Sequence, residues 1–87
     1  MDFEFDPAKS VANLRKHGID FLDARALWTD PDRLEIPARS LDKPRTQVIG
    51  RIGDSVWSAF TTMRGDKVRI ISVRRARDEE KAAYLQD

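Results

Sequence analysis

Arginine side chains offer the main chemistry that this sequence could perform. A guanidinium group pairs bidentately with phosphate oxygens and stays charged at any physiological pH. The candidates lie in the second half of the chain, with two hydroxyl side chains among them: Arg45, Thr62, Arg64, Arg69, Ser72 and Arg74. The sequence has no glycine-rich phosphate loop and no serine-nucleophile motif. These residue types therefore indicate recognition of phosphate groups.

His17, preceded by Lys16, is the only imidazole in the sequence. It is the one obvious candidate for a general acid or base near neutral pH. The alternative is structural, because a histidine beside Gly18 in the last turn of a helix can bond the terminal carbonyl groups. The sequence leaves both interpretations open.

The basic residues are concentrated in one part of the chain. Residues 39–77 contain ten Lys or Arg and three Asp or Glu, whereas residues 1–38 contain five bases and eight acids, and residues 78–87 contain one base and four acids. The formal net charge of +1 therefore conceals a basic segment between two acidic ends. Such a segment attracts polyanions, including nucleic acids. The alternative is that long arginine stems only cover a sheet and extend their charges into water.

Three consecutive antiparallel strands are predicted to position the arginines. They span residues 45–52, 55–64 and 67–74, which are rich in Val, Ile, Thr, Trp and Phe. Gly53-Asp54 and Gly65-Asp66 suit two-residue turns, because glycine reaches positive φ without steric cost.

Two-residue turns fix a register for this sheet. The predicted cross-strand rows are Arg45/Thr62/Arg69, Gln47/Phe60/Ile71 and Ile49/Ser58/Val73. The opposite face is the better candidate for the core, and it would carry Val48, Trp57, Ala59, Met63, Val68, Ile70, Ser72 and Arg74. This register puts Arg64 and Arg74 on opposite faces, unless a bulge realigns one strand.

The first half of the chain predicts a short strand, two helices and a further strand. Residues 3–5 alternate as a strand does. Asp6-Pro7 begins a helix that runs to about Lys16, and its predicted buried stripe is Val11, Leu14 and Ala8. A second helix spans residues 21–28, capped by Asp20. A brief strand at 34–36 is ended by Pro37, residues 38–44 form a polar loop, and the last helix begins at Asp78.

The predicted fold class is α+β, in the order β-α-α-β-β-β-β-α, with an antiparallel sheet and the helices packed on one face. Eighty-seven residues correspond to one domain, 1–87, with a small core. The absence of cysteine and the single histidine argue against a metal site, and no cofactor is expected. No apolar run reaches membrane-spanning length and the first residues are acidic, so a cytoplasmic protein is expected.

Three stretches of the chain resemble BrnT-type toxins. They are FEFDPAKSVANLRKHGIDFLDA, the Asp-Pro at 30–31, and TTMRGDKVRIISVRRARDEEKAAY. The resemblance covers nearly the whole chain and implies a RelE-like fold. It also implies a type II toxin with endoribonuclease activity that arrests translation, and a small antitoxin partner that carries a DNA-binding domain and neutralises the toxin in a toxin–antitoxin hetero-oligomer.

The resemblance carries over to particular basic residues. These are Arg64 in TTMR, Ser72 and Arg74 in RIISVR, Arg45 before QVIG, and Lys16-His17 in RKHG. The chain departs from the family pattern at Lys43-Pro44 and at Met63, where the family often has acidic residues. A carboxylate base at either position is therefore absent from this chain.

The resulting hypothesis is metal-independent RNA cleavage, in which the ribose 2′-hydroxyl attacks the adjacent phosphate. Arg64 and Arg74 are assigned to the scissile phosphate and His17 to acid or base catalysis. The residues expected to bind RNA phosphates are Arg45, Arg69, Lys16 and Ser72. The alternative is a non-catalytic module that binds nucleic acid or a partner protein through the basic face. Both bind RNA less tightly at high salt, but only an enzyme leaves cut products.

Overall fold

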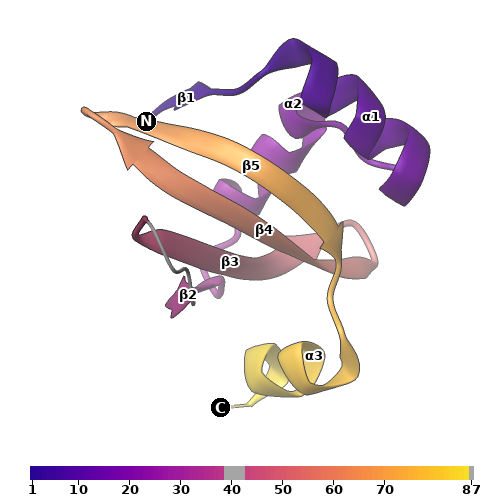
Figure 1. The fold of residues 1–87 in the computed structure, drawn as a ribbon. Helices are drawn as coiled ribbons and strands as arrows, with labels where there is room; N and C mark the ends of the chain where they lie inside the picture. Colours follow the sequence, from indigo (N-terminus) through magenta and orange to yellow (C-terminus); the bar gives the residue numbers. More distant parts are fainter. Residues whose placement is uncertain (39–42, 87) are drawn as a thin grey trace.

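The computed structural model describes residues 1–38 and 43–86, which form a five-stranded sheet with helices on both faces (Figure 1). The α+β class and the predicted order of elements are confirmed. The elements are β1 (Asp2–Glu4), α1 (Pro7–His17), α2 (Phe21–Ala24), a 3₁₀ helix (Arg25–Thr29), β2 (Leu34–Ala38), β3 (Arg45–Ile52), β4 (Ser55–Arg64), β5 (Lys67–Arg75) and α3 (Asp78–Leu85). Residues 39–42, which make up most of the predicted polar loop, lie outside the described residues.

The three strands predicted to position the arginines are present, and their two tight turns are as expected. Ile52 pairs with Ser55, and Arg64 pairs with Lys67, so each turn contains two residues. Gly53 and Gly65 have φ values of 60° and 62°. This left-handed conformation is strained for a residue that carries a side chain, but not for glycine. The turn chemistry therefore fixes how the strands begin to pair.

A β-bulge at Ile71 changes the register partway along the β4–β5 pair. Thr61 pairs with Ile70, but Phe60 pairs with Ser72, so Ile71 is an extra residue on β5. Beyond it the predicted rows are wrong: Ser58 faces Arg74 rather than Val73. A bulge turns every later side chain of its strand to the other face.

The bulge decides which residues form the core. The prediction is confirmed for Val48, Trp57, Ala59, Val68 and Ile70, which are all buried. It is wrong for Ser72 and Arg74, which the bulge moves to the opposite face, while Val73 takes their place with 0% exposure. It is also wrong for Met63, which is 59% exposed near the end of β4.

Two details of the sheet differ from the prediction. The sheet is mixed rather than fully antiparallel, because β1 pairs in parallel with β5 at one edge. At the other edge β2 continues through Pro37 to Ala38, which an outer strand tolerates because only one of its sides is hydrogen-bonded. The strand order is β1-β5-β4-β3-β2.

The helices also occupy both faces instead of one. The first two helices and the 3₁₀ helix pack on the face that contributes Val48, Ala59 and Val73 to the core. α3 lies on the opposite side, where Glu80 bonds Gln47 and Ser58 (Figure 1). None of the described helices is long and apolar enough to cross a membrane.

Polar side chains, rather than aliphatic ones, attach α1 to the sheet. Val11 and Leu14, predicted to be buried, are 52% and 46% exposed, and Ala8 is exposed as well. Asn13 is buried and spans the layers: its amide nitrogen donates to the carbonyl oxygens of Ile19 (2.8 Å) and Val73 (2.9 Å), and its oxygen accepts from the Val73 N–H at 3.1 Å. Asn13 therefore satisfies both backbone groups of Val73 in β5.

Candidate nucleic-acid interface

An open basic depression lies where β3 begins and where β4 turns into β5. Its described lining consists of Lys9, Lys43, Pro44, Arg45, Thr62, Met63, Arg64, Arg69 and Ile71. The Thr62 hydroxyl donates to the Pro44 carbonyl at 2.9 Å, which ties the start of β3 to β4. Arg45 forms no side-chain hydrogen bond or ion pair with residues 1–38 or 43–86 that would occupy its guanidinium. The depression therefore gathers positive charge from α1, β3, β4 and β5.

Glu4 on β1 balances part of this charge. Its Oε1 lies 3.5 Å from Nε of Arg64 and 3.4 Å from Nη1 of Arg69. These are long contacts, and the Arg64 side chain is 61% exposed. An exposed pair such as Arg64–Glu4 contributes about 1 kcal/mol or less, so a phosphate group can replace the carboxylate at Arg64 at little cost.

Arg74 lies on the same face but is bound much more tightly. Its Nη1 and Nη2 donate to Oε1 and Oε2 of Glu80 at 2.7 and 2.9 Å, and only 22% of the Arg74 side chain and 14% of the Glu80 side chain are exposed. Glu80 also accepts from Gln47 Nε2 (2.6 Å), Ser58 Oγ (3.0 Å) and the Arg77 N–H (2.8 Å). Every side of this carboxylate is therefore hydrogen-bonded.

The electrostatics of this pair follow from its geometry. Hydrogen bonds from Arg74 lower the pKa of Glu80 to about 2, against the opposing effect of burial. The same bonds raise the pKa of Arg74 above its ordinary value. The pair remains fully ionised at neutral pH, and Arg74 is not available to a phosphate while Glu80 is in place.

Polar contacts hold α3 on this face. None of its residues is buried. Besides Glu80, its anchor is the Tyr84 hydroxyl, which donates to Asp30 Oδ2 at 2.5 Å. Asp30 accepts at the same time from the N–H groups of Arg51 (2.8 Å) and Asp32 (2.9 Å). The hydrogen bond to Asp30 raises the pKa of Tyr84.

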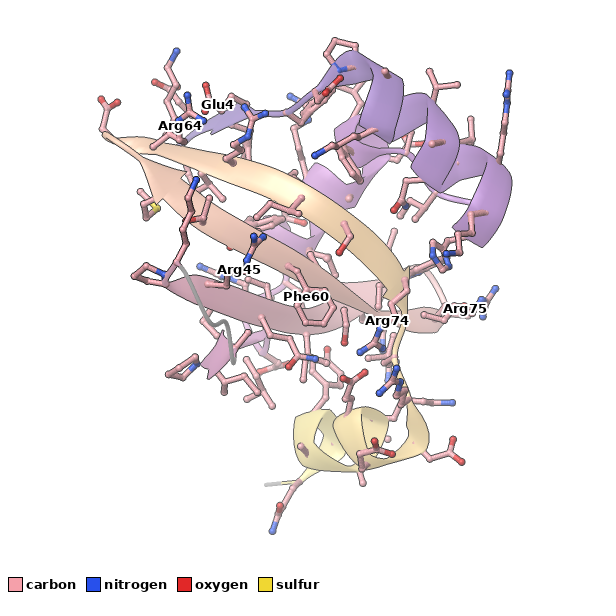
Figure 2. All side chains as sticks on the ribbon, viewed as in Figure 1. Glu4, Arg45, Phe60, Arg64, Arg74 and Arg75 are labelled. Atoms are coloured by element: carbon pink, nitrogen blue, oxygen red, sulfur yellow. The ribbon has the colours of Figure 1, made fainter. Side chains whose placement is uncertain are left out.

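The structure brings some of the predicted site residues together and separates others. Arg45, Arg64 and Arg69 meet in the basic depression. Arg74 lies farther along the same face than Arg45 and Arg64 (Figure 2), and the bulge brings Ser72 to this face as well. Lys16 and His17 lie at the end of α1, the helix that packs on the opposite face. His17 is in the last turn before Gly18, which has φ 82° and caps the helix through its N–H to the Leu14 carbonyl.

Two carboxylates and an aromatic ring on this face were absent from the predicted site. Glu4 and Glu80 both bond predicted arginines, but neither could be found by local spacing, because they come from the parallel edge strand and from α3. The predicted register places Phe60 on this face but assigns it no function. Its ring lies 5.2 Å from the Arg74 guanidinium carbon.

The fold and this face define a small α+β protein with an open, basic surface suited to phosphate-rich ligands. The chain belongs to the family described as the ribonuclease toxin, BrnT, of type II toxin-antitoxin systems, whose profile matches residues 5–80. The resemblance noted in the sequence is thereby confirmed. The class of activity is that of a ribonuclease toxin, and its family implies a cognate antitoxin. A search of curated proteins gave no match.

Proposed function

We propose that this chain cleaves RNA without a metal ion, through attack of a ribose 2′-hydroxyl, and thereby arrests translation in the cytoplasm. One observation supports the proposal most directly: Arg45, Arg64 and Arg69 converge on one open depression in a chain of a ribonuclease-toxin family. The proposal includes neutralisation by a cognate antitoxin that carries a DNA-binding domain and forms a hetero-oligomer with the toxin.

The proposed reaction forms a bond from the 2′-oxygen to the adjacent phosphorus and breaks the bond from that phosphorus to the 5′-oxygen. The 2′-hydroxyl loses a proton, the leaving 5′-oxygen gains one, and the products are a 2′,3′-cyclic phosphate and a 5′-hydroxyl. Negative charge grows on the phosphate oxygens in between. Guanidinium groups stabilise that charge where it develops, and the loss of one such donor costs roughly 2 to 4 kcal/mol of barrier.

Within this proposal, we assign a role to each arginine from how accessible its guanidinium is. Arg64 and Arg69 bind the scissile phosphate, because both line the depression and their contacts with Glu4 are long. Arg45 positions the RNA. Arg74 would reach a phosphate only after Glu80 is displaced. The assignments of Lys16 and Ser72 to phosphate binding and of His17 to proton transfer remain predictions.

A cleavage assay in EDTA tests the proposal. Purified protein is incubated with an end-labelled RNA, beside the Arg64→Ala and Arg69→Ala variants and the matched control Arg15→Ala. Arg15 is exposed on α1, so its removal changes the net charge equally without touching the depression. We expect the wild type and Arg15→Ala to cut the RNA, and each depression variant to cut it about 30- to 1,000-fold more slowly.

The result that contradicts the proposal is equally specific. Equal cleavage by all four proteins would exclude the depression as the site. RNA binding without products, in EDTA and also on translating ribosomes, would indicate the non-catalytic module instead. Growth arrest on expression, relieved by the cognate antitoxin, checks the cellular part of the proposal.

A further inference from the structure

One aromatic ring stands apart from the others in this molecule. Of the seven aromatic side chains, five pack in or against the core: Phe3, Phe5, Phe21, Trp28 and Trp57. Tyr84 belongs to α3, where its hydroxyl is bonded to Asp30. Phe60 is the remaining one, and it lies on the basic face of the sheet, away from the core (Figure 2).

The position of Phe60 on β4 is central to the basic face. Thr62 follows it by two residues and lines the basic depression, and Ser58 precedes it by two residues and bonds Glu80. Since residues two apart on one face of a strand are separated by roughly 7 Å, the ring lies one step from each of these positions. Phe60 thus lies between the arginines of the basic depression and Arg74.

The ring is also held in a defined place. Its cross-strand partners are Gln47 on β3 and Ser72 on β5. The Arg74 guanidinium carbon lies 5.2 Å from the ring centre, and Glu80 fixes that guanidinium with two hydrogen bonds. Phe60 is only partly buried, so the part of the ring that Arg74 leaves uncovered remains accessible among charged groups. Pre-positioning reduces the entropy lost on binding.

We propose that Phe60 is the base-stacking residue of this interface and that the substrate class is single-stranded RNA. This inference rests on the proposed function and deepens it. A nucleotide with a splayed-out base can place its flanking phosphate at Arg45, Arg64 and Arg69 while the base stacks on Phe60. In a duplex the faces of the bases are covered by their neighbours, so this ring has nothing to stack on. The ring accepts any base, since every base has a π-face.

Binding measurements with a non-cleavable probe separate stacking from charge and from catalysis. The probe is a short fluorescent 2′-O-methyl RNA, which lacks the attacking hydroxyl, used single-stranded and annealed to its complement. The variants are Phe60→Leu, Phe60→Trp and the matched control Phe3→Leu, which makes the same change on the other side of the sheet, where Phe3 contacts Trp28. Thermal unfolding shows which variants are folded.

We expect Phe60→Leu to weaken binding of the single strand about tenfold, with the dependence on salt unchanged, because no cation is lost. Phe60→Trp should restore or strengthen binding, and its added tryptophan emission should change when the single strand binds. Phe3→Leu should bind like the wild type, and none of the variants should alter duplex binding.

Three results would overturn the inference. The first is equal binding of the single strand by wild type and folded Phe60→Leu. The second is an equal loss on single strand and duplex. The third, decisive even if Phe60→Leu fails to fold, is no emission change in Phe60→Trp on saturation with the single strand. If the wild type binds no RNA at low salt, the proposed function itself fails, and the inference fails with it.

Discussion

Replacement of Glu80 by glutamine tests a carboxylate that is hydrogen-bonded through both of its oxygens. The change Glu80→Gln keeps the shape of the side chain but removes its charge. It therefore leaves Arg74, whose side chain is 22% exposed, without its counter-ion. Gln47, Ser58 and the Arg77 N–H also donate to this carboxylate, so several hydrogen bonds weaken at once.

The magnitude follows from the pKa of Glu80. Folding lowers this pKa from 4.5 to about 2, chiefly through Arg74, and each unit corresponds to about 1.4 kcal/mol. The ionised carboxylate therefore contributes about 3 kcal/mol to the free energy of unfolding. Because the pKa is lower in the folded state, this contribution is complete above about pH 5 and disappears as the pH falls to about 2.

Urea unfolding, followed by tryptophan fluorescence at a series of pH values, measures this contribution. We expect the wild type to exceed Glu80→Gln by about 3 kcal/mol at pH 7, and we expect the difference to approach zero near pH 2, where the protonated glutamate resembles glutamine. Glu79→Gln is the matched control, because Glu79 is exposed on the same helix. It should show no such difference. A gap between wild type and Glu80→Gln that is constant with pH, or absent at pH 7, would refute the reasoning.

Two further changes test how the helices are attached. Asn13→Ala should lower the free energy of unfolding by about 2 to 4 kcal/mol, because it leaves both backbone groups of Val73 unpaired. Urea unfolding measures this loss. The control Val11→Ala, at an exposed position of the same helix, should change the free energy of unfolding by less than about 0.5 kcal/mol. Tyr84→Phe should lower the protection of the α3 amides from hydrogen exchange by about 1 kcal/mol and leave the β4 amides unaffected. An equal loss of protection in α3 and β4 would show that the hydroxyl does not act locally.

Local sequence rules predicted most of the sheet. Alternating apolar residues on either side of the Gly53 turn gave β3 and β4 with the bounds they have in the structure, because turn geometry and strand propensity act over short distances. The same register brought Arg45 and Arg69 together, and the structure places both in the basic depression. Short-range rules are sufficient where the partners are joined by tight turns.

The remaining features depend on contacts between distant parts of the chain. Asn13 is buried because Val73, sixty residues later, needs its hydrogen bonds. Arg74 lies on the basic face because of the bulge at Ile71, and no glycine or other turn residue in the sequence predicts that bulge. Glu80 pairs with Arg74 only when α3 is packed against the sheet. None of these follows from helical or strand periodicity.

The bulge at Ile71 also limits how this strand can change over evolution. Its effect comes from the presence of one extra residue between Ile70 and Ser72, so the identity of the side chain at that position is open to drift. Loss of the residue would turn Arg74 toward the core and Val73 toward solvent while altering the composition hardly at all. Single-residue insertions and deletions in β5 should therefore be much rarer among functional variants than substitutions, and the tolerated length changes should come in pairs of residues.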